Sequence, residues 1–171
     1  MPDRQLLAPA YPDDTGEAEP ALTTALAAHA ADPRSLPTAL AALQTARVLV
    51  PVVAVAGEVE LDEHGLAHDK TSDMAAVLVQ RPGGRRGLLA FSGSDTMAAW
   101  DPAARPVPVS ARTAALAAIQ DGAEALLLDL AGPAPLVVEG DHLRALAAGW
   151  RLVRIGSDLG WVDPAALTAP D

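Results

Sequence analysis

Two stretches of the chain share one order of elements, and this order constrains the fold more than any other feature. Each predicts a strand, a turn rich in Gly or Pro, a second strand, a glycine, a helix and a closing tryptophan, over about 28 residues. The pieces are 75–80, 88–91, Gly93 and Trp100 in the first stretch, and 125–128, 136–138, Gly140, 141–149 and Trp150 in the second. Either each stretch is a ββα unit whose helix covers its own hairpin, or two ordinary hairpins are alike by coincidence.

The remaining pattern predicts one more strand and several helices. The run 48–56 is apolar and rich in β-branched residues, which is typical of a buried strand, while Pro51 indicates a bulge or an edge. Helices are predicted over 21–31, 36–45 and 111–121. We therefore expect an α+β fold. Its sheet should be mixed or largely antiparallel, built from two ββα units plus one further strand, with the helices packed on it.

Small aliphatic side chains must fill most of the core. Of the 171 residues 50% are apolar, but one Phe, one Tyr and three Trp are the only aromatic residues. A domain of this size buries enough surface to be stable without cross-links. The predicted core residues are Leu40, Leu43, Val50, Val52, Val77, Val79, Leu89, Phe91, Leu116, Ile119, Leu127 and Val137.

The distribution of acidic residues and prolines suggests the domain boundaries. Residues 1–20 combine five acidic residues with four prolines and show little apolar periodicity, so we expect a disordered acidic tail. Residues 21–155 should form a single α+β domain, followed by a C-terminal extension over 156–171.

Charge and cysteine usage limit the partners and the compartment. The net charge is −10, so the average field repels polyanions and no nucleic-acid partner is expected. The chain has no cysteine, its N-terminus does not resemble a signal peptide and no run reaches membrane-spanning length, so we expect a cytoplasmic protein without a membrane partner. One lysine against eleven arginines, with abundant alanine, is typical of a GC-rich bacterial genome.

Several short pieces, taken in order, resemble the N-terminal domain of the enhanced serine sensitivity protein B (SseB) family. They are LAAL at 40–43, RVLVPV at 47–52, DMA at 73–75, LAFSG at 89–93, AWDP at 99–102, RPVPV at 105–109 and ALLLD at 125–129. The resemblance covers about residues 36–150. It implies a domain of that family, which has a characteristic fold but no agreed reaction.

A group of acidic residues and histidines has some features of a metal site. It consists of Asp62, Glu63, His64, His68 and Asp69. His64 and His68 are four residues apart, which would place both imidazoles on one helix face, but Gly65 disfavours a helix. A solvated loop explains the group better, so we predict neither a metal nor any other cofactor.

The turn formed by Ser92, Gly93, Ser94 and Asp95 lies between a predicted strand and a predicted helix. Its free backbone N–H groups could bind a small anion, or the Ser–Asp pair could simply cap the helix. If the two ββα units stack, His142 could approach Ser94 with Asp95 nearby, giving a small-molecule binder or hydrolase as the alternative function. The pattern of a nucleophile elbow is absent, however, and we predict no catalytic residue.

The stretch 100–109 is the best candidate for a protein-binding surface. Trp100, Asp101, Arg105 and Pro106 would form a stiff ledge, and Trp and Arg are enriched at interface hot spots. Alternatively, Trp100 closes the core and Arg105 pairs with Asp101. From the missing catalytic pattern and this ledge we expect a non-enzymatic interaction or regulatory domain that binds a protein partner or its own copy.

Overall fold

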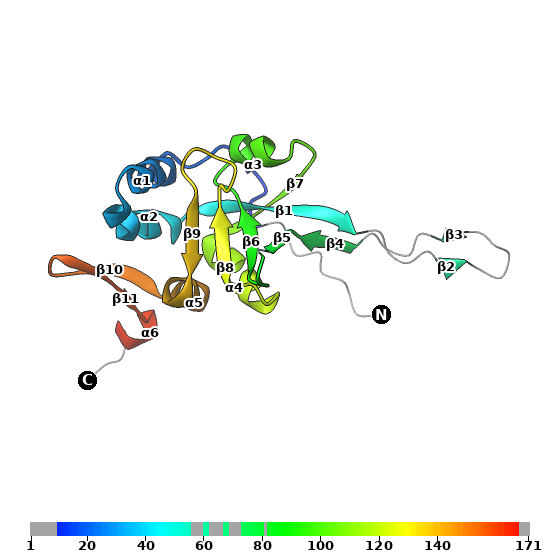
Figure 1. The fold of residues 1–171 in the computed structure, drawn as a ribbon. Coiled ribbons are helices and arrows are strands. Elements are labelled where there is room, and N and C mark those ends of the chain that lie inside the picture. The colour runs from blue at the N-terminus through cyan, green and yellow to red at the C-terminus, as the bar shows by residue number, and fades with distance from the viewer. Residues whose placement is uncertain (1–9, 56–59, 62–66, 69–72, 81, 168–171) are drawn as a thin grey trace.

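The computed structural model describes residues 10–55, 60–61, 67–68, 73–80 and 82–167, and Figure 1 shows their arrangement. The helices are α1 (Pro20–Ala31), the 3₁₀ turn η1 (Pro33–Ser35), α2 (Leu36–Leu43), α3 (Ser94–Trp100), α4 (Ala111–Gln120), α5 (Gly140–Ala148) and α6 (Pro164–Leu167). The strands are β1 (Arg47–Val55), β2 (Glu60–Leu61), β3 (Ala67–His68), β4 (Asp73–Ala76), β5 (Leu78–Gln80), β6 (Arg86–Ala90), β7 (Arg105–Ser110), β8 (Ala125–Leu128), β9 (Leu136–Glu139), β10 (Arg151–Ile155) and β11 (Asp158–Val162).

Two joined sheets form the centre of the molecule. One has the strand order β5-β6-β8-β9 and the other β4-β1-β7. Strands β6 and β8 are parallel, with Leu89 opposite Leu127, and the other neighbours in both sheets are antiparallel. Leu49 and Phe91 connect the sheets, since each backbone N–H donates to the other's carbonyl at 2.8 Å. The predicted α+β fold with a mixed, largely antiparallel sheet is confirmed.

The two predicted ββα units lie side by side where β6 meets β8, but their helices pack differently. Helix α5 contributes Leu143 and Leu146 to the main core, together with residues of β8 and β9. Helix α3 instead contributes Met97 to a smaller cluster. The tryptophans differ as well, because Trp100 packs on that smaller cluster whereas Trp150 is 41% exposed. The expectation that Trp150 closes its unit is therefore wrong.

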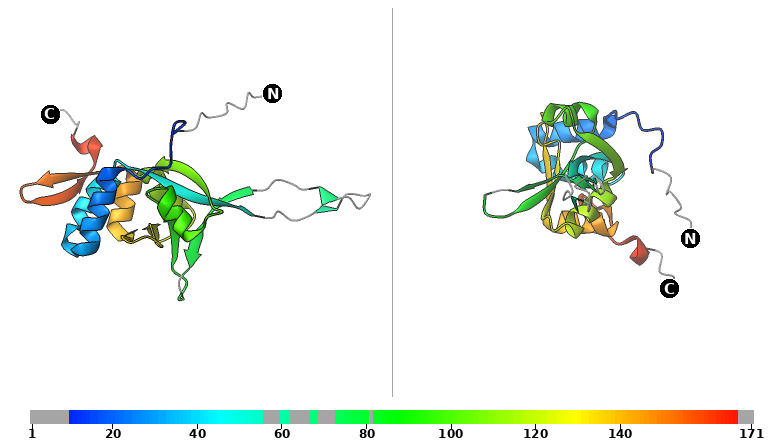
Figure 2. Two further views of the ribbon diagram at one scale, coloured as in Figure 1. Left: turned by 90° about the horizontal axis from the view of Figure 1, so that it is seen from above. Right: turned by 90° about the vertical axis from the view of Figure 1, so that its right-hand side faces the viewer.

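The main core lies between one face of the β5-β6-β8-β9 sheet and helices α1, α2, α4 and α5. Side chains alternate along a strand, so every second residue of each strand points to these helices. On this face lie the buried residues Leu88, Ala90, Leu126, Leu128, Leu136 and Val138. Figure 2 shows α1 and α2 packed side by side at one side of the sheet.

Three predicted core residues are exposed by about two-fifths of their surface. In α4, Leu116 and Ile119 are 42% and 41% exposed, because Ala111, Ala114, Ala115 and Ala118 form the buried stripe. In β9, Val137 is 43% exposed while its neighbours Leu136 and Val138 are buried. The other predicted core residues are buried (Leu40, Leu43, Val50, Leu89 and Phe91) or half-buried (Val52, Val77, Val79 and Leu127).

The described residues at both ends of the predicted domain make contacts with it. Residues 10–19, the described part of the predicted acidic tail, contact the domain, and α1 begins at Pro20. At the other end, β10 and β11 pair as an antiparallel hairpin across the expected boundary at 155. The hairpin is held by Gln44, whose side-chain amide accepts from Leu152 N at 2.8 Å and donates to Leu152 O at 3.3 Å.

Most of the histidine-containing group at 62–69 lies outside the described residues, which include only the backbone of Ala67–His68 in β3. Within the described ranges, no helix is both long enough and apolar enough to cross a bilayer.

Candidate interaction site

The second face of the sheet carries a small apolar cluster at one end. Leu49, Leu89, Phe91 and Met97 are buried there, and the ring of Trp100 stacks on Phe91 with centroids 5.7 Å apart. Trp100 is only half-buried, so it covers this cluster and also borders the surface. Its position agrees with the alternative in which this tryptophan closes the core.

The remaining ledge residues are accessible. Arg105 and Pro106 are exposed in β7, where they pair with Val52 and Pro51 of β1. Asp101 is half-buried and accepts a hydrogen bond from Ala103 N at 2.8 Å. Within the described part of the chain, Arg105 forms no ion pair with Asp101.

The turn proposed for anion binding already has partners inside the protein. Ser92 donates its backbone N–H and its hydroxyl to the carboxylate of Asp129, at 2.8 and 2.6 Å. The backbone N–H of Ser94 donates to Gly16 O at 2.7 Å. An anion could therefore bind to Ser92 or Ser94 only by displacing these contacts. Asp95 is exposed in the first turn of α3.

Arg47, Ser92 and Asp129 form a buried polar group beneath this turn. Each is less than 9% exposed. Arg47 donates from Nη1 to Ser92 O at 3.0 Å, and its Nε lies 2.5 Å from Asp14 Oδ2. Asp129 also accepts from Thr96 Oγ1 at 2.6 Å and adopts a left-handed backbone with φ of 52°. The group joins the N-terminal segment to the ends of β6 and β8.

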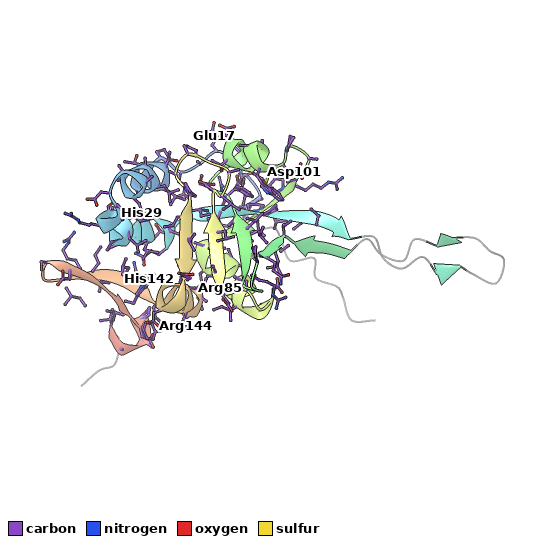
Figure 3. All side chains as sticks on the ribbon, in the orientation of Figure 1. Glu17, His29, Arg85, Asp101, His142 and Arg144 are labelled. Atoms are coloured by element: carbon purple, nitrogen blue, oxygen red, sulfur yellow. The ribbon has the colours of Figure 1, made fainter. Side chains whose placement is uncertain are left out.

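The structure does not bring His142 to Ser94. Strand β9 runs antiparallel to β8, so α5 begins beside the first residues of β6, whereas α3 follows its last residues. Strand β6 has five residues, so at about 3.3 Å per residue it is roughly 16 Å long. This length separates His142 from Ser94. In Figure 3, His142 lies at one end of the sheet and Asp101 at the other. His142 Nδ1 instead accepts from Trp161 Nε1 at 2.9 Å, and no general base reaches across such a distance.

A hollow of about 90 Å³ opens on the face of the β5-β6-β8-β9 sheet opposite α4 and α5. Figure 1 looks onto this face, with α4 behind the strands. The apolar residues lining it are Val79, Gly87, Ala125, Leu127, Leu130 and Val137, and we call this surface the sheet-face hollow. Leu130 and Val137 are each 43% exposed, so apolar surface remains uncovered on an otherwise buried sheet.

A charged rim borders the sheet-face hollow. Arg85 donates from Nε to Glu124 Oε2 at 2.7 Å and from Nη2 to Glu139 Oε2 at 3.1 Å. The hydrogen bond to Glu124, with the negative charge of Glu139, raises the pKa of Arg85 above its ordinary value. The three side chains are exposed, so the ion pairs contribute little to stability but fix the charges around the hollow.

Sequence reasoning missed both the sheet-face hollow and the buried polar group. The hollow was hidden because Val79, Leu127 and Val137 were expected to be covered. Arg47 and Asp129 each flank an apolar strand as a single charged residue, a weak signal that gains meaning only when distant partners are known. In the described residues, no group of three or more His, Cys, Asp or Glu is arranged to hold a metal ion.

Comparison with known proteins identifies the domain. The family model for the SseB protein N-terminal domain matches residues 22–145, which confirms the resemblance inferred from the sequence. Searches of curated proteins and of solved structures found no match.

Proposed function

The chain belongs to the SseB N-terminal domain family, and on that premise we propose that it is a non-enzymatic interaction domain acting in the cytoplasm. It binds a protein partner through the sheet-face hollow. The observation that carries this proposal is the exposed apolar surface of Leu130, just after β8, and of Val137 in β9, where a helix or a second layer would usually cover the sheet.

The composition of the surface supports a protein partner. Interfaces commonly have an apolar centre and a polar rim. Here Leu130 and Val137 provide the centre, and Arg85, Glu124 and Glu139 provide a rim of mixed charge. Covering about 100 Å² of apolar surface would contribute roughly 2.5 kcal/mol, so the hollow can act as an anchor within a larger contact.

The predicted ledge extends this surface. Trp100 and the hollow residues Val79 and Leu127 pack against the same small cluster, so the ledge and the hollow are connected through it. Arg105 and Pro106 are accessible next to that cluster. We propose that the partner contacts the hollow first and that Arg105 contributes from the edge of the interface.

The partner can be captured from the hollow itself. A photo-crosslinking amino acid replaces Val137 in one full-length chain and Ile155 in a matched control, since Ile155 is an exposed apolar residue of the β10–β11 hairpin. Irradiation in the native cytoplasm should give a discrete adduct from position 137 that is absent from position 155. The same adducts from both positions would contradict the proposal.

Binding of the captured protein is then measured with purified variants. Val137→Glu should weaken binding at least tenfold, because a carboxylate would be desolvated at the centre of the interface. Ile155→Glu, which also places a carboxylate at an exposed β-branched residue, should leave binding unchanged because Ile155 lies in the β10–β11 hairpin. Arg105→Glu tests the ledge separately. Unaltered affinity after Val137→Glu in a folded chain would overturn the assignment of the hollow.

A further inference from the structure

The acidic segment 14–19 covers the end of the sheet where β1 begins and β6 turns into α3. Asp14 pairs with Arg47 Nε, the carbonyl of Glu17 accepts from Arg47 Nη2, and Glu19 Oε1 accepts from Arg47 N at 3.0 Å. The carbonyl of Gly16 accepts from Ser94 N at 2.7 Å. Figure 3 places Glu17 at this end of the sheet, away from Arg85 at the sheet-face hollow.

The segment is bound through its backbone and charges rather than through apolar side chains. The Asp14 side chain is only 9% exposed, but no apolar residue of 10–19 joins the core, whereas Leu22 and Leu26 of the following helix α1 are among the core residues. Segments with few buried apolar contacts open at low free energy while the rest of the fold stays intact. Residues 14–19 can therefore leave while α1 remains in place.

The surface beneath the segment is shaped to receive a backbone. A Cβ at Gly93 would lie 2.8 Å from Ala18 N and 3.1 Å from Gly16 O, so the missing side chain makes room for the segment. On the segment, Gly16 likewise lies close to Ser94 of helix α3. Its φ is +79°, and a Cβ there would lie 2.1 Å from Ser94 Oγ. Glycine is required on both sides of this contact.

Opening also separates a cation from its counter-ion. The side chain of Arg47 is 9% exposed while the segment is in place, and Asp14 provides its carboxylate partner. Once the segment has left, the guanidinium faces the groove without a carboxylate, and it hydrogen-bonds an ionised acceptor more strongly than a neutral one. The vacated groove therefore selects an acidic replacement.

We propose that this groove binds an acidic segment of a partner protein and that residues 14–19 occupy it as an internal competitor. The contacts define the ligand as Asp-x-Gly-x-x-Glu with a left-handed backbone at its glycine. Its Asp pairs with Arg47, its Gly passes Ser94, and its Glu accepts from the N–H of Arg47. The tethered segment competes at an effective concentration on the order of millimolar. A partner segment must therefore bind tightly enough to displace it.

The test uses the full chain with Gly16→Ala, which displaces the segment without altering the groove. The probe is a fluorescent peptide with the sequence of residues 10–19, followed by anisotropy. The peptide should bind the Gly16→Ala chain at least about tenfold more tightly than the unaltered chain, because its competitor has been weakened. An Asp14→Asn peptide should bind at least about tenfold more weakly, because it lacks the charge that pairs with Arg47.

Three controls keep the test decisive. Adding Gly93→Ala to the Gly16→Ala chain should abolish peptide binding, and adding Val137→Glu should not change it, which separates this site from the sheet-face hollow. If Gly16→Ala does not fold by circular dichroism, Asp14→Asn in the full chain weakens the segment without backbone strain. The proposal is overturned if the folded Gly16→Ala chain or the folded Asp14→Asn chain does not bind the peptide. It is also overturned if the Asp14→Asn peptide binds as tightly as the unaltered peptide. If the unaltered chain forms dimers and the peptide dissociates them, the ligand is residues 14–19 of a second copy. That result would contradict the proposal that the ligand belongs to a different protein.

Discussion

The carboxylate of Asp129 accepts both the backbone N–H and the hydroxyl of Ser92, at 2.8 and 2.6 Å. This two-point contact joins residues that follow the parallel strands β6 and β8. Thr96 of α3 donates to the same carboxylate, so one side chain fixes two strand ends and a helix. The turn at Ser92 is consequently a structural junction.

We expect Asp129→Ala to lower the free energy of unfolding by about 3 kcal/mol or more. The change leaves buried donors of Ser92 without an acceptor and places alanine in a left-handed backbone. Asp129→Asn should lose less, because Asn keeps one acceptor oxygen and tolerates this backbone conformation. Urea denaturation measures both variants. A loss below about 1 kcal/mol for Asp129→Ala would contradict the importance of the junction.

Gly87 gives Leu127 the space to lie across β6. A Cβ at position 87 would be 2.6 Å from Leu127 Cδ1, and both residues line the sheet-face hollow. Gly87→Ala should therefore destabilise the protein by about 1–3 kcal/mol, as expected for overpacking. In urea denaturation, Leu127→Ala added to Gly87→Ala should cost less than Leu127→Ala alone, because the two residues are coupled. Strict additivity of the two changes would show that they do not compete for space.

The β10–β11 hairpin depends on a single glutamine for its two hydrogen bonds to α2's end. Gln44→Ala removes both bonds to Leu152 and should increase amide hydrogen exchange of Leu152 by about tenfold or more, at about 1 kcal/mol per bond. Gln44→Glu keeps the acceptor for Leu152 N and should give a smaller increase. Amide protons of β8 should exchange as slowly as before in both variants. Faster exchange throughout the sheet would mean that Gln44 stabilises the whole domain.

The burial of a residue could be predicted from the sequence where its segment has a strong apolar pattern. Leu40, Leu43, Val50 and Phe91 were expected to be buried, and they are. Their segments have strong apolar patterns that fit a helix or a strand without ambiguity. The α+β class followed from the order of such segments, because hairpins with adjacent helices have few ways to bury their apolar faces.

Features that depend on distant partners could not be placed in the same way. The acidic composition of 10–19 is the same whether the segment is free or bound to Arg47, which lies 30 residues after Glu17. Asp129 and Ser92 are separated by 37 positions, and nothing local marks them as a pair. The sheet-face hollow was missed for another reason. An apolar strand residue predicts a buried face, and only the arrangement of helices shows which face is left uncovered.

In helix α4, the face that the sequence predicts to be buried differs from the face that is buried in the structure. The sequence pattern predicts that Leu116 and Ile119 face the core, but alanines form the stripe that packs between the sheet and α5. Small side chains let helices approach closely, so a larger residue there has no room. Ala115→Leu should therefore destabilise the protein by about 1–3 kcal/mol or more, although it adds apolar surface.

Leu116→Ala is the matched change on the exposed side of the same helix. Leu116 is 42% exposed and Ala115 is fully buried, so this truncation should change the free energy of unfolding by less than about 1 kcal/mol. Alanine also has the highest helix propensity, which offsets part of the lost contact. Urea denaturation of the two variants decides between the two orientations of α4. A large loss for Leu116→Ala with a small loss for Ala115→Leu would mean that the leucine stripe faces the core after all.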